Sequence, residues 1–438
     1  MNGFGSRRAW LGASWMLWCW SLVAPAVAAQ ERVSLAQVLE HADANAPDLV
    51  VARARVEEGL AARRGAERLL SDPLSLEVGA GPRIAEGTGE DFDLLVSLTQ
   101  PIEVAGERGA RLDVSDRLRE RRESEVEAIR WEVHREVHLQ FHVAIEARVR
   151  GEAAERRRAL AARLAEIARR RFEAGDIPEL DVALATAELA SAEQEIVRAR
   201  GILREAVLSL AEASGWPARS APMPLGGLDE PGEIGDDATL VARAQEGHPI
   251  LRALEAAVAE QSARVRLADV EAFPTLDLGV SFAREGSAGS PANYIGLLFA
   301  GVAIPVWDAN GTERAATRAA LSIAEVERDA LRGVIEARVL RAAAILRAAR
   351  ERVIIFVRDV LPGFERSIEL LTQGFDLGEL DALEVAGASR RLLEVQANAL
   401  DAFGDYHRAL AELEAQVGTE VVADAAHDAG SETAGGVR

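Results

Sequence analysis

Arg171-Phe172-Glu173-Ala174-Gly175 and Gly374-Phe375-Asp376-Leu377-Gly378 are two copies of one short motif, and the rest of the chain is arranged around them. In each copy a Phe stands three residues before a Gly, and a carboxylate and a Val follow that Gly after six and seven residues. The Phe and Gly positions differ by the same interval (375 − 172 = 378 − 175 = 203). Each motif lies between two helical patterns. It therefore predicts the tip of a helical hairpin, closed by a glycine in the left-handed conformation.

Other landmarks recur at nearly the same interval, which indicates a tandem duplication. Asn45-Ala46-Pro47 matches Gly247-His248-Pro249, and three further pairs are Pro73 with Pro274, Pro101 with Pro305, and Gly215 with Gly418. We therefore divide the chain into a first repeat (30–215), a linker rich in Gly, Pro and acid (216–236), a second repeat (237–418) and a small polar tail expected to be disordered (419–438).

Residues 1–29 have the pattern of a secretory signal peptide. Arg7 and Arg8 precede an apolar run over 10–23, and Ala26-Val27-Ala28 offers a cleavage site. An uncleaved anchor and a lipoprotein are the alternatives. The single Cys lies in this segment, so a cleaved chain would have no thiol chemistry. The formal net charge of −21 argues against nucleic acid as a partner.

Each repeat shows the order helix, β-hairpin, long helix, tip, helix. Helical patterns cover 34–70 (broken near Asn45 by Pro47), 106–172 and 178–213, then 237–272, 311–373 and 380–417. Pro362 should kink or break the second long helix. Period-two alternation predicts strands over 74–78, 94–98, 276–282 and 294–304, the last apolar on both faces.

Four strands in two separate hairpins cannot form a stable sheet alone. Their alternation on a secreted chain is typical of a membrane barrel, which must close so that no backbone group is left unpaired in lipid. The sequence thus predicts a mainly α protein with a small transmembrane β part. Three copies would supply a shared twelve-stranded barrel, and the long antiparallel helices would form a tube about 100 Å long with cyclic symmetry.

The duplicated element order and the two Phe-x-x-Gly tips with an acid six residues past each Gly resemble TolC-type outer-membrane efflux proteins, over about 33–418. Within that family, the stretch 98–108 is similar to the cobalt–zinc–cadmium efflux branch, although Glu107 stands where that branch favours Lys. The resemblance implies a homotrimeric channel in the outer membrane of a Gram-negative bacterium, in contact with lipid, whose helices form a tunnel across the periplasm. It also implies a periplasmic adaptor (membrane fusion) protein and a proton-driven inner-membrane pump as partners.

The resemblance also implies roles for residues at the tips. Phe172 and Phe375 can anchor the turns, and Gly175 and Gly378 can cap the helices. In the family the tips also dock the adaptor, which gives adaptor-contact residues Arg171, Phe172, Gly175, Phe375 and Gly378. Asp181 and Glu384 can be ordinary surface charges, or they can line a periplasmic gate as the acid of the second repeat does in the family. The family's further acid, three residues on, is Gly387 here.

His134, His138 and His142 share one helical face, a spacing that can bind metal. A polar stripe against another helix is the alternative, and we predict no metal site and no cofactor there. No catalytic constellation is evident, so an enzyme is not predicted.

The sequence therefore favours a passive efflux duct, with heavy-metal cations as the preferred cargo. Organic drugs or a secreted protein are alternative cargoes. A periplasmic coiled-coil scaffold without a pore is the alternative of a different class.

Overall fold

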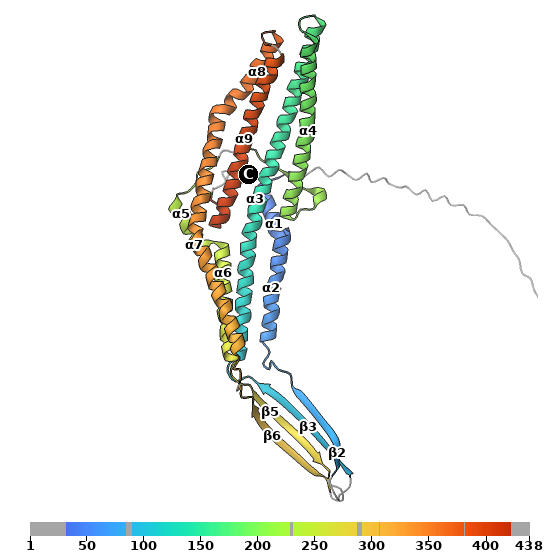
Figure 1. Ribbon diagram of the computed structural model, residues 1–438, viewed down its shortest axis with the longest axis vertical. Helices are drawn as coiled ribbons and strands as arrows, with labels where there is room; N and C mark the ends of the chain where they lie inside the picture. Colours follow the sequence, from blue (N-terminus) through green and yellow to red (C-terminus); the bar gives the residue numbers. More distant parts are fainter. Residues whose placement is uncertain are drawn as a thin grey trace, which may run out of the picture.

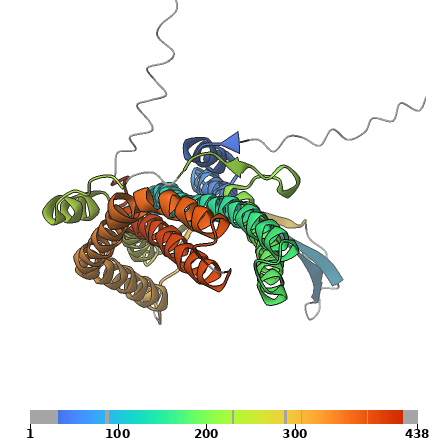
Figure 2. The ribbon, with the colours of Figure 1, turned by 90° about the horizontal axis from the view of Figure 1, so that it is seen from above.

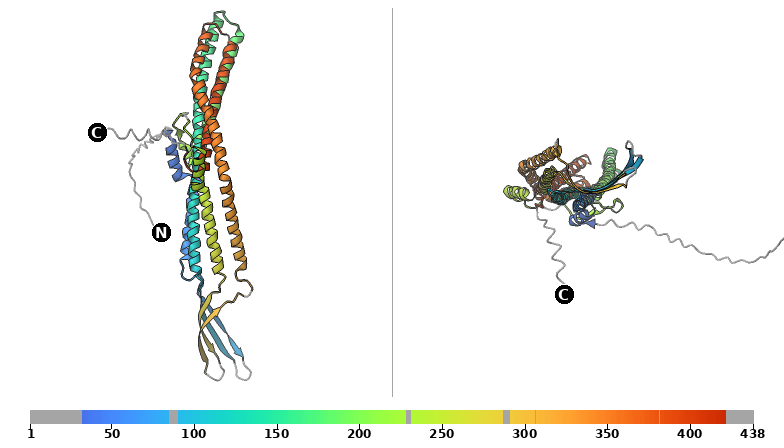
Figure 3. Two further views of the ribbon diagram at one scale, coloured as in Figure 1. Left: turned by 90° about the vertical axis from the view of Figure 1, so that its left-hand side faces the viewer. Right: turned by 90° about the horizontal axis from the view of Figure 1, so that it is seen from below.

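Figure 1 shows the computed structural model, an elongated molecule with long helices at one end and a β-sheet at the other. The structure describes residues 32–84, 90–227, 231–286, 291–305, 307–380 and 382–421. In the side view of Figure 3, the helices run from the sheet to the far end, where two helical hairpins close. The predicted signal peptide and all but three residues of the predicted tail (419–421) lie outside the described residues.

The same order of elements occurs twice along the chain. The first set is α1 (Leu35–Asn45), α2 (Pro47–Ala66), β2 (Ser75–Ile84), β3 (Glu90–Ile102), α3 (Glu107–Glu173) and α4 (Glu179–Ser214). The second set is α5 (Asp237–Gly247), α6 (Pro249–Val270), β5 (Leu276–Glu285), β6 (Asn293–Val302), α7 (Gly311–Ile355), the π-helical turn η2 (Phe356–Val360), α8 (Leu361–Asp376) and α9 (Ala382–Val417).

The first helix of each set is divided by a proline, as the sequence predicts for Pro47. Ser34 caps α1 through the predicted capping box with Gln37. The last helix of each set ends beside the point where the proline divides the first helix. A Cβ added at Gly215 would collide with the backbone of Asn45, and one added at Gly418 would collide with Pro249. Both glycines also have positive φ, so each position requires glycine for two reasons.

The two long helical segments differ in continuity. The 67 residues of α3 form one helix, about 100 Å long at 1.5 Å per residue. Its counterpart is interrupted by η2 between α7 and α8. Pro362 lies two residues after the end of η2 and has no N–H to donate to the carbonyl four residues earlier, so the regular ladder cannot continue. The predicted break at Pro362 is confirmed.

Both β-hairpins belong to one antiparallel sheet with the order β2-β3-β5-β6. The central β3–β5 ladder pairs Val96 with Phe282 and Leu98 with Val280. This corrects the expectation of two separate hairpins. The strands of the first hairpin also extend beyond the predicted ranges 74–78 and 94–98, since β2 ends at Ile84 and β3 begins at Glu90. Pairing within the first hairpin, from Gly81 with Asp93 to Ile84 with Glu90, carries these two strands beyond their alternating apolar core.

One face of this sheet is apolar across all four strands. Residues paired directly across antiparallel strands share a face, and the register puts Leu76, Val78, Val96, Leu98, Leu278, Val280, Phe282 and Leu298 on the same one. Several are open to solvent in a single chain: Leu76 is 63% exposed and Leu298 86%. The other face carries Glu77, Ser97 and Ser281 on the first three strands, but Leu297 on β6.

Each half has its own helical core, rich in Ala. Val137 and Phe141 of α3 pack with Leu210 of α4, and in the second half Leu346 of α7 packs with Phe403 of α9. Small side chains let the helices approach closely. Figure 2, a view from above, shows the helices in an open, curved arrangement rather than in a closed bundle.

The segment 216–236, predicted as a linker, contains the 3-10 turn η1 (Ala218–Ser220) and the strand β4 (Met223–Pro224). β4 pairs in parallel with β1 (Arg32–Val33), which ties this segment to the start of the first half. Within the described ranges, no helix combines the length and the apolar character needed to cross a membrane.

Candidate functional site

The two tips have the same backbone structure, a Schellman motif at the end of α3 and of α8. The N–H of Gly175 donates to the Phe172 carbonyl at 2.9 Å, and the N–H of Asp176 donates to the Arg171 carbonyl at 2.9 Å. The second tip repeats both bonds, from Gly378 to Phe375 at 3.2 Å and from Glu379 to Gly374 at 2.9 Å. The φ angles are +81° at Gly175 and +77° at Gly378, which confirms the predicted left-handed glycine caps.

The two phenylalanines have opposite environments. Phe375 is 2% exposed. It packs with Ile167 and Ala168 of α3 and with Val385 of α9, in a small core cluster that joins the two hairpins. Phe172 is 43% exposed. One motif therefore buries its aromatic ring within the chain, and the other presents its ring at the surface.

Arg171 of the first tip contacts the second tip. Its guanidinium lies 5.7 Å from the centre of the Phe375 ring, and its Nη1 donates to the Phe375 carbonyl oxygen at 3.2 Å. A Cβ at Gly378 would come within 3.3 Å of its Nη2. The adaptor contact that the sequence predicts for Arg171 stays a prediction, and within the chain the same side chain makes this contact with the second tip.

The two predicted gate acids lie at the start of the returning helices. Asp181 is half-buried in the first turn of α4, where a negative charge is favourable to the helix dipole. α4 begins at Glu179, one residue later than predicted, because Pro178 is extended and stands outside the helix. Glu384 lies in the first turn of α9 and is exposed. The Figure 1 view places both tips at the end opposite the sheet.

A second group of polar residues lies where α3 packs against α9, between the two halves. His138 contacts Glu414, with Nδ1 and Oε2 3.1 Å apart. His142 stacks on His407 with ring centres 3.5 Å apart and planes 9° from parallel. We call this line of contacts the α3–α9 seam. One turn beyond His142 along α3, Glu146 lies against Gly404, and one turn further in the same direction Arg150 pairs with Asp401.

The predicted histidine stripe is thus divided in the structure. His134 does not join the seam; it contacts Asp43, with Nε2 and Oδ1 2.8 Å apart. His138 and His142 meet His407, which the sequence analysis did not name. His407 is 265 residues from His142 (407 − 142 = 265), and it stands alone on its helix. Only the antiparallel register of α3 and α9 brings it to the stripe.

Burial keeps two of these imidazoles neutral. It lowers the pKa of His407 to about 3, with a further contribution from nearby His138. Burial, together with His407 and His138, also lowers the pKa of His142 well below its ordinary value. Both ring nitrogens of His407 and the Nδ1 of His142 are shielded from solvent and have no hydrogen-bond partner among the described residues. An unpaired buried polar atom is costly and calls for an explanation.

The chain is similar to known proteins in sequence, and its fold is similar to that of solved structures. A model of the family described as outer membrane efflux protein matches residues 38–216 and again 240–419. The chain is 28% identical over 311 residues to the cobalt-zinc-cadmium resistance protein CzcC of Cupriavidus metallidurans, covering 70% of this chain and 73% of that protein.

Solved structures share the fold. A membrane protein from Pseudomonas aeruginosa superposes with a TM-score of 0.71 at 16% identity, covering 89% of this chain and 93% of that chain. The Campylobacter jejuni CmeC outer membrane channel superposes with a TM-score of 0.69 at 16% identity, covering 91% and 89%.

Proposed function

Because the chain belongs to the outer membrane efflux protein family, we propose that it is the outer-membrane duct of a tripartite exporter for heavy-metal cations. As a member of that family it is an outer-membrane efflux channel. The proposal concerns its assembly, its partners and its cargo. The observation that carries the assembly is the sheet: one face is apolar on all four strands and lies exposed in a single chain.

Three chains together would pair the edge strands of this sheet. β2 and β6 are its edge strands, and neither has a strand on its outer side among the described residues. Pairing β6 of one chain with β2 of the next would close a barrel of twelve strands, remove every edge and place the apolar face in lipid. The helices would then form the periplasmic tunnel, with an aqueous path that needs no energy source of its own.

Substitutions on the two faces of the sheet test the barrel. Leu76→Asp and Val280→Arg put a charge on the lipid face and should block recovery from the outer membrane, since Arg near the bilayer midplane costs about 2–4 kcal/mol and Asp somewhat less. Ser281→Asp is the matched control on the other face and should insert normally. Recovery of the wild-type protein as a soluble periplasmic monomer would favour the scaffold alternative.

The tips are proposed to contact a periplasmic adaptor, which in turn meets a proton-driven inner-membrane pump. Phe172 is the best-placed contact, because its ring is already at the surface. Arg171, Gly175, Phe375 and Gly378 would shape that surface. Asp181 and Glu384, two copies of one position, would line the entrance in a trimer, where like charges repel one another and attract cations.

The cargo proposal rests on the resemblance to the cobalt-zinc-cadmium resistance protein. A strain lacking this gene should lose tolerance to zinc, cobalt and cadmium and regain it from the wild-type gene. Glu384→Gln should restore tolerance less completely if the gate acid serves cations. Unchanged metal tolerance, together with increased sensitivity to organic toxins, would move the proposal to organic drugs; a secretion defect alone would point to a protein cargo.

A further inference from the structure

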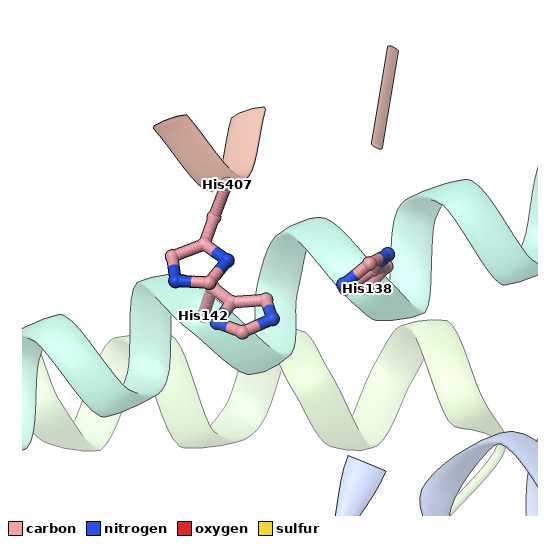
Figure 4. Close-up of side chains that lie close together, drawn as sticks. All are labelled: His138, His142 and His407. Carbon is pink, nitrogen blue, oxygen red and sulfur yellow. The ribbon is translucent and has the colours of Figure 1, made fainter. Parts of the chain in front are cut away.

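We infer that His138, His142 and His407 form a transition-metal site that joins the two halves of the chain across the α3–α9 seam. Figure 4 shows the three side chains, two from adjacent turns of α3 and one from α9. One nitrogen of each lies within 4.8 Å of those of the other two. The site is distinct from the tips and gate acids, so it does not depend on the nature of the cargo.

The geometry is close to that of a three-histidine centre. Imidazole ligands bind Zn²⁺ at about 2.0–2.1 Å in a tetrahedral arrangement, so an ion would draw the three nitrogens to about 3.3 Å from one another, from separations of up to 4.8 Å. A metal lies in the plane of each ring that binds it. The stacked rings of His142 and His407, 9° from parallel, must therefore turn apart to share one ion. That turn would also give the Nδ1 of His142 and one of the two shielded nitrogens of His407 the partner that each lacks.

The residues around the site suit a neutral-ligand metal centre. Metal binding requires deprotonated histidine, and the burial of His142 and His407 favours that form. Glu414 accepts a hydrogen bond from His138 Nδ1 when that nitrogen carries the proton, which leaves Nε2 for the metal. A carboxylate in this position orients the ring and strengthens it as a ligand.

The choice of metal follows from the ligand set. Three nitrogens with no sulfur favour Zn²⁺, Co²⁺, Ni²⁺ or Cu²⁺ over Ca²⁺ and Mg²⁺, which prefer oxygen. We assign Zn²⁺ as the reference ligand and Co²⁺ as its spectroscopic probe. Because α3 belongs to the first half and α9 to the second, a bound ion would fix one half against the other.

Calorimetric titration of the purified full-length protein in detergent with Zn²⁺ tests the site. The wild type should bind one ion per chain. His142→Ala and His407→Ala should abolish that binding, and Glu414→Gln should weaken it about 10- to 100-fold. His134→Ala is the matched control on the same helix, with its own partner in Asp43, and should bind as the wild type does.

Two further measurements separate loss of metal from loss of fold. Co²⁺ should give the visible absorption of a tetrahedral nitrogen site in the wild type and not in His407→Ala. Zn²⁺ should raise the melting temperature of the wild type and leave that of His142→Gln unchanged, while circular dichroism shows equal helix content. Failure of the wild type to bind Zn²⁺ or Co²⁺, binding unaffected by His407→Ala, or equal loss in His134→Ala would each overturn the site.

Discussion

The two tips share a backbone motif but differ in what surrounds it. Both end a helix with the same pair of hydrogen bonds and a glycine of positive φ. At the second tip, Phe375 is buried against the first hairpin, and Arg171 lies over its ring. At the first tip, Phe172 is at the surface. Local sequence therefore sets the shape of a tip, whereas its neighbour in space sets what the tip's aromatic ring does.

The largest expected effect separates the two phenylalanines. Phe375→Ala removes a ring from a packed cluster and should cost about 3–5 kcal/mol of local stability. Phe172→Ala should cost no more than about 0.5 kcal/mol, as at other exposed positions. Hydrogen exchange and limited proteolysis of the α8–α9 tip would measure both. Equal loss of protection in the two variants would refute the difference between the tips.

The two glycines should differ by a smaller amount. Alanine in the left-handed conformation costs about 1–2 kcal/mol at either position. Gly378→Ala should cost more than Gly175→Ala, since its new methyl would press on the Arg171 guanidinium, whereas Gly175 has nothing within 4 Å. Melting temperatures of the two variants give the comparison. A larger effect at Gly175 would contradict the contact with Arg171.

Arg171 is expected to stabilise the tip to which it does not belong. Arg171→Ala should expose the α8–α9 tip to proteolysis and leave its own helix end folded, at a cost of about 1 kcal/mol for the lost ring contact. Arg170→Ala is the control, because that side chain is largely exposed and its closest carboxylate, Glu166, is 4.0 Å away. If both variants lose protection to the same extent, the contact is not what holds the second tip.

The smallest effect concerns the divided first helices. His248 Nδ1 accepts the N–H of Ile250 at 3.2 Å, whereas Ala46, its counterpart, makes no side-chain cap. Burial, with a further contribution from Arg338, lowers the pKa of His248 below 6.5. The unfolded chain therefore binds the proton more readily, and this contribution to stability is lost as pH falls below 6.5.

Comparison of unfolding at pH 7 and pH 5 checks the sign. The wild type should lose more stability on acidification than His248→Ala. That variant places in the second half the alanine that the first half has at the equivalent position, Ala46. A variant that loses just as much would show that His248 makes no contribution.

Features governed by neighbouring residues could be predicted from the sequence. The capping box at Ser34, the glycine caps and the break at Pro362 each depend on a few consecutive positions. The order of helices and strands followed from periodicity in the same way. These are the parts of the fold in which one residue type has one physical consequence.

Features that depend on pairing between residues far apart in the chain could not be predicted from the sequence. The β3–β5 ladder joins strands about 180 residues apart, and nothing in either hairpin specifies the register of the other. The burial of Phe375 depends on α3, more than 200 residues earlier. His407 has no histidine near it in sequence, so no motif could connect it to His138 and His142.

The π-helical turn at Phe356–Val360 has a mechanical consequence. A sideways force applied to the first tip is carried along α3, which has no interruption over 67 residues. A force on the second tip meets η2 after the 16 residues of α8, about 24 Å down the helix at 1.5 Å per residue. Bending concentrates where the regular hydrogen-bond ladder is broken. The first hairpin is therefore expected to resist bending along its whole length, whereas the second is expected to bend at η2.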